Sequence, residues 1–228
     1  MKARRSLLAL AGGLGLAVAA CQQPAFAAEE FVRAPAAKAE AHESGGLKTA
    51  IFAGGCFWGI EAVFSHVKGV KSAVSGYHGG TEKTANYATV STGRTGHAEA
   101  VKITYDPKVV RYDQLMRIFF SVGADPTQKN RQGPDVGTQY RTAIVPLSAE
   151  QNRVAKAYLA QMKAGNSWGR PIVATIERGQ AFYPADAHHQ DFAAKNPNHP
   201  YIRRWDAPKV AALSKYYPQF YSRSFQRN

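Results

Sequence analysis

The apolar residues between positions 48 and 177 change their spacing in a set order, and this order limits the folds open to the chain. Helical spacing occurs around Ile60 and again around Leu115. Strand-like segments lie on either side of these two helices, at residues 48–53, 70–77, 98–105 and 139–145. The order strand, helix, strand, strand, helix, strand is that of the split βαβ unit of ferredoxin-like domains. The sequence therefore predicts an α+β fold, a two-layer sandwich with a mixed sheet.

Three further segments complete this prediction. A capping box formed by Ser148 and Gln151 starts a third helix that we expect to end near Met162, and residues 172–177 give one more strand. Residues 79–97 are rich in glycine, serine and threonine without a period, which indicates a loop. The aromatic-rich C-terminal tail has prolines and short spacings, so we expect an irregular segment that wraps the surface.

The N-terminal residues have the pattern of an export signal. Three cations within the first five residues precede an apolar run over residues 7–20, which is shorter than a bilayer requires. Cleavage after Ala27 fits the small-residue rule, whereas residues 18–21 resemble a lipoprotein box that ends at Cys21. The Arg4-Arg5 pair also fits twin-arginine export. We expect a periplasmic or envelope-associated protein, a lipoprotein if Cys21 is the processed residue.

Composition suggests how the rest of the chain is divided. Residues 28–46 are mostly Ala, Glu and Lys with two glycines, which favours a flexible linker. The globular domain is expected over residues 47–206, and residues 207–228 form an extension that packs on it. No apolar segment after the signal is long enough to span a membrane. We expect a monomer.

The net charge of +13 first suggests an anionic partner. However, the basic residues are scattered, no run of five like charges occurs, and no nucleic-acid-binding signature is present. We therefore expect no nucleic-acid partner. No metal or organic cofactor is expected either, since four histidines considered as ligands have no recognisable ligand spacing: His97, His188, His189 and His199.

Cys56 is the most reactive candidate in the sequence. Gly54 and Gly55 end the first predicted strand, and the first predicted helix starts at the cysteine. The positive end of the helix dipole and the free backbone N–H groups there favour a thiolate, which is the nucleophilic form. The alternative is a buried structural cysteine, because unpaired cysteines are among the most buried residues. If cleavage follows Ala27, Cys56 is the only thiol left.

Two neighbouring features also allow two interpretations. Phe57 and Trp58 follow the cysteine and belong either to the core or to the wall of a pocket around an apolar, polarised group. Glu99 falls in the alternating segment 98–105, on the same face as Val101 and Ile103. On its own this pattern favours a salt-bridged carboxylate at a strand end.

The run Gly54-Gly55-Cys56-Phe57-Trp58-Gly59 resembles the active-site motif of the A-type peptide methionine sulfoxide reductases. The resemblance extends from about Ala50 to Trp205. Four further segments agree with that family in the same order: Gly96-His97-Ala98-Glu99-Ala100-Val101, Tyr105-Asp106-Pro107, Gly137-Thr138-Gln139-Tyr140-Arg141 and His189-Gln190-Asp191. Five spaced matches are far more specific than one short motif.

The resemblance implies a reaction centred on Cys56. The sulfur would attack the sulfur of methionine sulfoxide, release methionine and become a sulfenic acid. Glu99 would supply the proton for the sulfoxide oxygen, and burial beside apolar residues would keep its carboxyl group protonated. The implied substrate is methionine S-sulfoxide, free or in oxidised proteins, and the implied role is protein repair.

The resemblance also implies roles for the other site residues. Tyr87 and Tyr140 would donate hydrogen bonds to the sulfoxide oxygen, and Phe57 with Trp58 would hold the S-methyl group against their ring faces.

Two further positions match the family less specifically. Asp135 matches an aspartate that lines the site. His189 matches a histidine proposed to assist the thiol chemistry, although the adjacent His188 leaves the choice open.

The chain departs from many family members in its tail. They carry further cysteines near the C-terminus that resolve the sulfenic acid as a disulfide, and residues 196–228 contain none. Cys21 is no substitute if it is removed with the signal or carries lipid. We therefore expect an external dithiol, thioredoxin-like or another periplasmic reductant, to reduce Cys56 directly.

Two alternatives from other classes remain at this point. A hydrolase or transferase could use Cys56, His189 and Asp135 as nucleophile, base and orienting group, with no need for a protonated Glu99. A non-enzymatic envelope-binding module could use the positive charge on anionic lipid or peptidoglycan, and Cys56→Ser would then leave its function intact.

Overall fold

The computed structural model describes residues 30–227, so the predicted export signal lies outside the described residues. The helices and strands are, in chain order, β1 (Lys48–Ala53), α1 (Phe57–Ser65), β2 (Val70–His78), η1 (Glu82–Thr84), α2 (Tyr87–Val90), β3 (Ala98–Tyr105), α3 (Tyr112–Ile118), η2 (Phe119–Gly123), β4 (Arg131–Gln132), β5 (Asp135–Val136), η3 (Thr138–Tyr140), β6 (Ala143–Val145), α4 (Ala149–Ala164), β7 (Thr175–Ile176), β8 (Phe182–Pro184), α5 (Phe192–Lys195), η4 (Ile202–Asp206) and α6 (Ala207–Tyr216).

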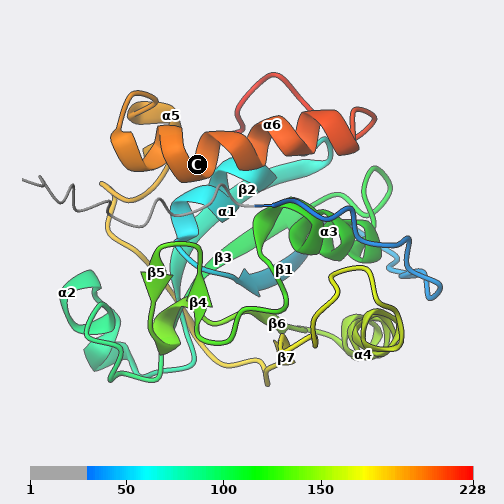
Figure 1. The fold of residues 1–228 in the computed structure, drawn as a ribbon, viewed down its shortest axis with the longest axis horizontal. Coiled ribbons are helices and arrows are strands. Elements are labelled where there is room, and N and C mark those ends of the chain that lie inside the picture. The colour runs from blue at the N-terminus through cyan, green and yellow to red at the C-terminus, as the bar shows by residue number, and fades with distance from the viewer. Residues whose placement is uncertain (1–29, 228) are drawn as a thin grey trace, which may run out of the picture.

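The main sheet follows the predicted topology. Its strand order is β7-β6-β1-β3-β2-β8 (Figure 1). The four central strands, β6, β1, β3 and β2, pair with one another in antiparallel fashion, in the arrangement that a split βαβ unit produces. At the edges, β7 runs parallel to β6 and β8 runs antiparallel to β2. The predicted α+β fold with a mixed sheet is confirmed.

The core lies mainly between one face of the sheet and the helices. Phe52 of β1 stacks on Phe119 with ring centroids 5.0 Å apart, and the fully buried Ile60, Leu115 and Tyr158 bring in α1, α3 and α4. The opposite face of the sheet carries a smaller cluster of buried residues: Ile51, Ala53, Ala98, Ala100, Ala143 and Val145. Burial of this apolar surface is the main stabilising contribution to such a domain.

The C-terminal tail is more regular than the sequence predicts. In place of an irregular segment, residues 207–216 form α6, which packs along α1 (Figure 1). Pro208 fits the first turn of this helix, where the N–H that proline lacks has no helical acceptor. Ala212 and Leu213 are buried, so the extension contributes to the core.

Short elements also differ from their predictions. The loop expected over residues 79–97 contains η1 and α2, and the side chain of Asn86 caps α2 by accepting a hydrogen bond from the Thr89 N–H at 3.1 Å. The strand expected over residues 172–177 is limited to Thr175–Ile176 at the sheet edge.

Residues 30–46 are held against the domain, although the sequence predicts a flexible linker there. This N-terminal arm has no helix or strand, but its backbone is bound by side chains of the domain. The Ala34 N–H donates to Ser121 Oγ at 2.9 Å, and the Ala41 N–H donates to Asp113 Oδ1 at 2.9 Å. Tyr158 Oη donates to the carbonyl oxygen of Pro35 at 2.7 Å. These acceptors and donors come from distant parts of the chain, which is why local composition does not reveal them.

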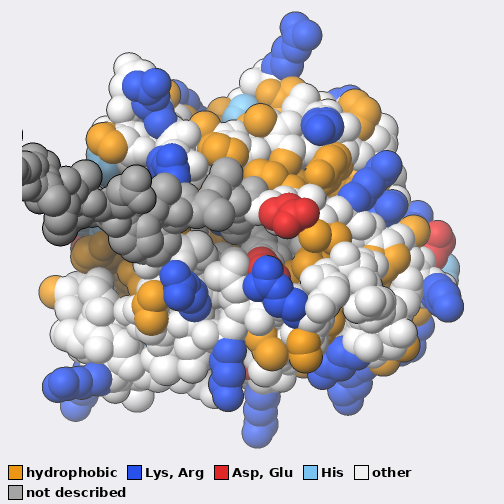
Figure 2. Space-filling view, in the orientation of Figure 1, with side chains coloured by type: hydrophobic (Ala, Val, Ile, Leu, Met, Phe, Trp, Pro, Cys, Tyr) orange, Lys and Arg blue, Asp and Glu red, His pale blue; other side chains and the backbone are white. Residues whose placement is uncertain are grey.

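The basic residues are scattered over the visible surface, as the sequence predicts. Figure 2 shows Lys and Arg side chains at separate points over the visible face, with few acidic groups between them. Within residues 30–227, no helix combines the length and apolarity needed to cross a bilayer.

Candidate active site

Cys56 lies at the N-terminus of α1, as the sequence predicts, and two glycines bring it there. Gly55 has φ +85°, which favours glycine, and a Cβ at this position would lie 2.5 Å from Cβ of Gln132. A Cβ on Gly54 would lie 2.6 Å from Cβ of Ala124. The turn between β1 and α1 therefore has no room for side chains at these two positions. It places Cys56 as the N-cap of α1.

Glu99 faces Cys56 from the neighbouring strand. The alternation of β3 places Glu99 on the same side as Val101 and Ile103, and only 1% of its surface is exposed. Its Oε2 accepts a hydrogen bond from the Phe57 N–H at 3.0 Å, next to Cys56 in the first turn of α1. Burial, with a smaller contribution from the nearby Asp135, raises the pKa of Glu99 to about 8 despite the lowering effect of the Phe57 N–H. At neutral pH this carboxyl group is mainly protonated.

Tyr87, Tyr140 and Asp135 complete the polar part of the site. Burial raises the pKa of both tyrosines, and the charges of Glu99, Cys56 and Asp135 raise it in each case, so these groups lie within interaction range of one another. Tyr87 is 40% exposed and Tyr140 is half-buried. Both phenols are neutral and therefore available as hydrogen-bond donors.

Trp58 and His189 form the aromatic part of the site. The Trp58 indole N–H donates to Nδ1 of His189 at 3.3 Å, and the indole stacks on Phe192 with centroids 3.8 Å apart. The His189 ring also lies 4.6 Å from that of Tyr87 and 5.3 Å from that of Phe57. Burial lowers the pKa of His189, which agrees with a neutral imidazole that accepts at Nδ1.

This arrangement distinguishes the two adjacent histidines and the two roles considered for Phe57. His188 is exposed, whereas His189 is 3% exposed within the site. Phe57 is 1% exposed and packs against both Tyr77 and His189, so it belongs to the core and to the floor of the site together.

The protonation of Cys56 differs from the sequence prediction of a thiolate. Burial raises the pKa of the thiol well above its usual value, and the carboxyl groups of Glu99, Asp206 and Asp135 raise it further. The Trp58 N–H at the helix start lowers it by a smaller amount. Desolvation and three acidic neighbours thus raise the pKa of Cys56 more than the helix N-terminus lowers it, and the resting site holds a thiol.

Three residues of the tail reach the site, and the sequence analysis missed all of them. Tyr201 Oη makes a short hydrogen bond to Oδ2 of Asp135, and its ring contacts Trp58 edge to face. Asp206 and Lys209 are buried beside the first turn of α1, where a Cβ on Gly59 would meet Oδ1 of Asp206 at 2.4 Å. For Asp206 and Lys209 the available signal is Asp206 followed by Pro208, an N-cap and first-turn pattern for a helix.

The geometry does not form the hydrolase triad considered above. In such a triad the aspartate would orient the histidine through Nδ1. Here Nδ1 of His189 accepts from Trp58, and Asp135 is hydrogen-bonded to Tyr201. The site instead combines a thiol, a protonated acid, two phenols and an aromatic wall, which suits reduction of a small polar group that carries an oxygen.

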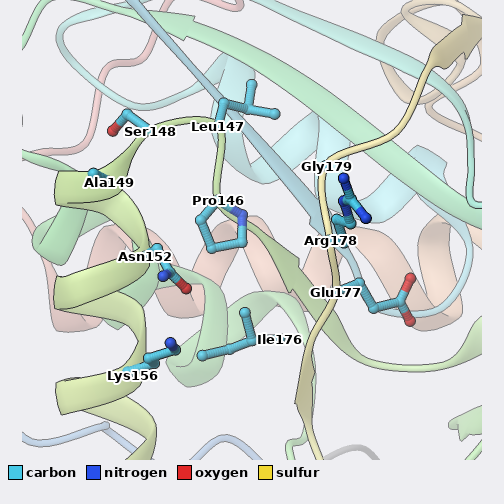
Figure 3. A pocket seen from close by; sticks show the side chains of 10 residues that line it. All are labelled: Pro146, Leu147, Ser148, Ala149, Asn152, Lys156, Ile176, Glu177, Arg178 and Gly179. Carbon is cyan, nitrogen blue, oxygen red and sulfur yellow. The ribbon is translucent and has the colours of Figure 1, made fainter.

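A separate groove of about 620 Å³ lies between α4 and β7 and contains none of the predicted site residues (Figure 3). Within residues 30–227, no three His, Cys, Asp or Glu side chains gather in a way that could hold a metal ion.

Comparison with known sequences gives a family match. The family described as peptide methionine sulfoxide reductase matches residues 48–220. Peptide methionine sulfoxide reductase MsrA 2 of Mesorhizobium japonicum is 55% identical over 177 residues, which cover 78% of this chain and 91% of that protein. MsrA 2 of a Synechocystis species is 52% identical over 172 residues, covering 75% and 80% respectively.

Solved structures agree with this match. The reduced form of Mxr1 from Saccharomyces cerevisiae is 32% identical with a TM-score of 0.61, and the match covers 71% of this chain and 92% of Mxr1. Methionine sulfoxide reductase A of Corynebacterium diphtheriae is also 32% identical with a TM-score of 0.61, covering 68% and 78%.

Proposed function

The chain belongs to the peptide methionine sulfoxide reductase family and is an enzyme that reduces methionine sulfoxide, and we propose that Cys56 is its nucleophile and Glu99 its proton donor. The observation that supports this assignment best is the pair of a half-buried thiol and a buried carboxyl group, both of raised pKa. They are linked through the hydrogen bond from the Phe57 N–H to Glu99. The reaction repairs methionine after oxidative damage.

The chemical step requires one proton on this pair. Once the Cys56 thiol has lost its proton, the thiolate attacks the sulfur of the sulfoxide while Glu99 protonates the oxygen. The sulfur–oxygen bond of the substrate then breaks, methionine leaves, and the hydroxyl group remains on Cys56 as a sulfenic acid. Glu99 ends as a carboxylate, and the two electrons that reduce the substrate come from the cysteine sulfur.

The remaining side chains bind and orient the substrate. Tyr87 and Tyr140 hydrogen-bond the sulfoxide oxygen, whose negative charge they stabilise without transferring their protons. The Trp58 indole, fixed by His189 and Phe192, holds the S-methyl group against its electron-rich face. Asp135 lines the site and fixes Tyr201. We assign the S epimer, free or in proteins, because this is the substrate that the family resemblance implies.

An external dithiol restores the oxidised enzyme. Cys56 is the free cysteine among residues 30–227, and the tail after residue 196 contains no other. A thioredoxin-like or similar reductant attacks the sulfenic acid, releases water as a mixed disulfide forms, and then frees Cys56 with its second thiol.

Turnover of residues 28–228 on separate R and S epimers of methionine sulfoxide with a small dithiol tests the assignment. We expect reduction of the S epimer only, with the activity of Cys56→Ser abolished. Reduction by Cys56→Ser at the original rate would contradict the role of Cys56. Reduction of the R epimer at the same rate would contradict the assigned stereochemistry.

We also propose that the protein is exported as a periplasmic or envelope-associated monomer. The cations and the apolar run before residue 21 support export, although they lie outside the described residues. N-terminal sequencing and the mass of the mature protein distinguish cleavage before Ala28 from a lipid-modified Cys21. A mature chain that still begins at Met1 would contradict export by either route.

A further inference from the structure

Arg141 follows Tyr140 directly, and its guanidinium group joins three segments around the site. Its Nη1 donates to the carbonyl oxygen of Thr138 at 3.1 Å, inside η3, which carries Tyr140. Its Nη2 donates to the carbonyl oxygen of Gly96 at 3.1 Å, three residues before Glu99. Its Nε and Nη2 also donate to the two carboxylate oxygens of Glu177, at 2.6 and 3.0 Å. The arginine thus ties the segment of Tyr140 to the start of β3.

The backbone around Arg141 leaves room for the guanidinium group and little else. A Cβ on Gly79 would lie 2.9 Å from Nη2 of Arg141 and 3.0 Å from the carbonyl oxygen of Gly96. Gly79 has φ +99°, a conformation that side chains rarely adopt. The end of β2 therefore closes the same space from a third direction.

Glu177 is the anchor of this arrangement. Arg141 and Glu177 are 20% and 23% exposed, so their ion pair is largely removed from solvent. Figure 3 shows the Glu177 carboxylate pointing away from Asn152 and Lys156, which line the groove along α4. On the inner side, Nδ1 of the buried His78 lies 3.6 Å from Oε2 of Glu177. Burial alone would raise the pKa of Glu177, but His78 and Arg141 lower it to about 2, so this carboxylate is charged at neutral pH.

We propose that Arg141, paired with Glu177, is a positioning residue for methionine sulfoxide reduction that holds the Tyr140 hydroxyl group at a fixed distance from Glu99. This inference rests on the proposed function, because Tyr140 must act on the sulfoxide oxygen for its position to matter. Direct contact between η3 and β3 also holds the segment of Tyr140 against the strand that carries Glu99. A planar guanidinium with five donors can bind Thr138, Gly96 and Glu177 together, whereas the single ammonium of a lysine cannot.

Arg141→Lys tests the proposal because it keeps the positive charge and removes the planar guanidinium group with its several hydrogen-bond donors. We expect kcat/KM for the S epimer to fall about 10-fold to 100-fold, mainly through kcat, since a shift of about 1 Å in a group that binds the transition state costs this much. Glu177→Gln, which keeps the side-chain shape, should give a smaller loss of the same kind and serves if Arg141→Lys does not fold.

A double-mutant cycle with Tyr140→Phe separates positioning from general stability. If Arg141 acts through the Tyr140 hydroxyl group, Arg141→Lys should change kcat/KM by less than about twofold in the Tyr140→Phe background. The matched control is Arg153→Lys, because Arg153 makes a similar two-point pair with Glu150 on α4 at 2.8 and 2.7 Å, in an exposed position. We expect this control to keep full activity.

The outcomes are distinguishable. Equal losses from Arg141→Lys in both backgrounds would overturn the positioning role while leaving the proposed function intact. A Tyr140→Phe enzyme with unchanged kcat/KM would overturn both the proposed role of Tyr140 and this inference. A loss in Arg153→Lys equal to that in Arg141→Lys would show a general effect of the charge pair on the fold and would also overturn the inference.

Discussion

At the scale of single residues, Glu99 and Cys56 titrate as a pair, and this pair should determine the pH profile. The pKa of Glu99 is about 8 and that of Cys56 is raised well above its usual value, so the fully protonated pair predominates at neutral pH. The productive form has lost one proton. We therefore expect kcat/KM to rise with pH through about 8 and to fall only above the usual pKa of a cysteine thiol, when the second proton leaves.

Glu99→Gln should change both the height and the shape of this profile. We expect the maximum to fall by about 10² to 10⁴-fold, which is the usual contribution of a general acid. The remaining rate should rise with pH without the alkaline fall, because only the ionisation of Cys56 is left. A bell-shaped profile retained in Glu99→Gln would contradict the role of Glu99. Initial rates on the S epimer over pH 6 to 10 provide the measurement.

His189 allows a second prediction at this scale, because the structure favours an orienting role over acid–base chemistry. His189→Asn offers a carbonyl oxygen to the Trp58 indole N–H and should keep most of the activity. His189→Leu offers no acceptor and should raise KM about 5-fold, since one hydrogen bond that orients the indole is worth about 1 kcal/mol. Steady-state kinetics of the two variants decide the point. Equal, large losses in kcat for both would indicate that the imidazole moves a proton.

The features of the site that depend on residues close together in the sequence could be predicted. Two glycines before Cys56 predicted the helix start, and the alternation of residues 98–105 predicted that Glu99 lies on the apolar face of its strand. The pKa of Cys56 could not be predicted in this way, because it depends on carboxyl groups that tertiary folding brings from Asp135 and Asp206. The same holds for Tyr201, which reaches Asp135 from 66 residues away.

At the scale of secondary-structure elements, long periodic segments were predictable and short ones were not. The strands and helices from β1 to α4 that contain several apolar residues on one face appear in the structure. The two-residue strands β4 and β5 are too short to show a periodic pattern. They pair with each other, and Gln132 of β4 packs against the glycine turn before Cys56. The N-terminal arm shows the same limit, since its partners are side chains on α3, η2 and α4.

The N-terminal arm should contribute measurably to stability. A chain that begins at residue 47 loses the buried Ala34 and Ala41 and leaves Ser121, Asp113 and Tyr158 without the partners they have in the arm. At about 1 kcal/mol for each hydrogen bond, we expect the free energy of unfolding to fall by at least about 3 kcal/mol. Urea unfolding of residues 47–228 against residues 30–228 measures this difference. Equal midpoints would support the flexible linker that composition alone predicts.

At the scale of the whole molecule, the C-terminal tail contributes packing contacts and a site residue, but no resolving cysteine. In the part of the chain that the structure describes, the tail places α6 on α1 and brings Tyr201 to Asp135, and it offers no second thiol to Cys56. A sulfenic acid formed there has no described cysteine to condense with. It should therefore persist until an external thiol reaches it.

Single-turnover chemistry follows from this arrangement. Without reductant, residues 28–228 should release one methionine per chain and retain Cys56 as a sulfenic acid that a dimedone-type probe labels. Addition of a dithiol should restore repeated turnover, because its second thiol frees Cys56 from the mixed disulfide. In the full chain, Cys21→Ser should leave both results unchanged, since Cys21 has no part in them. A disulfide between Cys21 and Cys56 after one turnover, found by peptide mass mapping, would show that the N-terminal segment supplies the missing thiol and that the enzyme resolves its own intermediate.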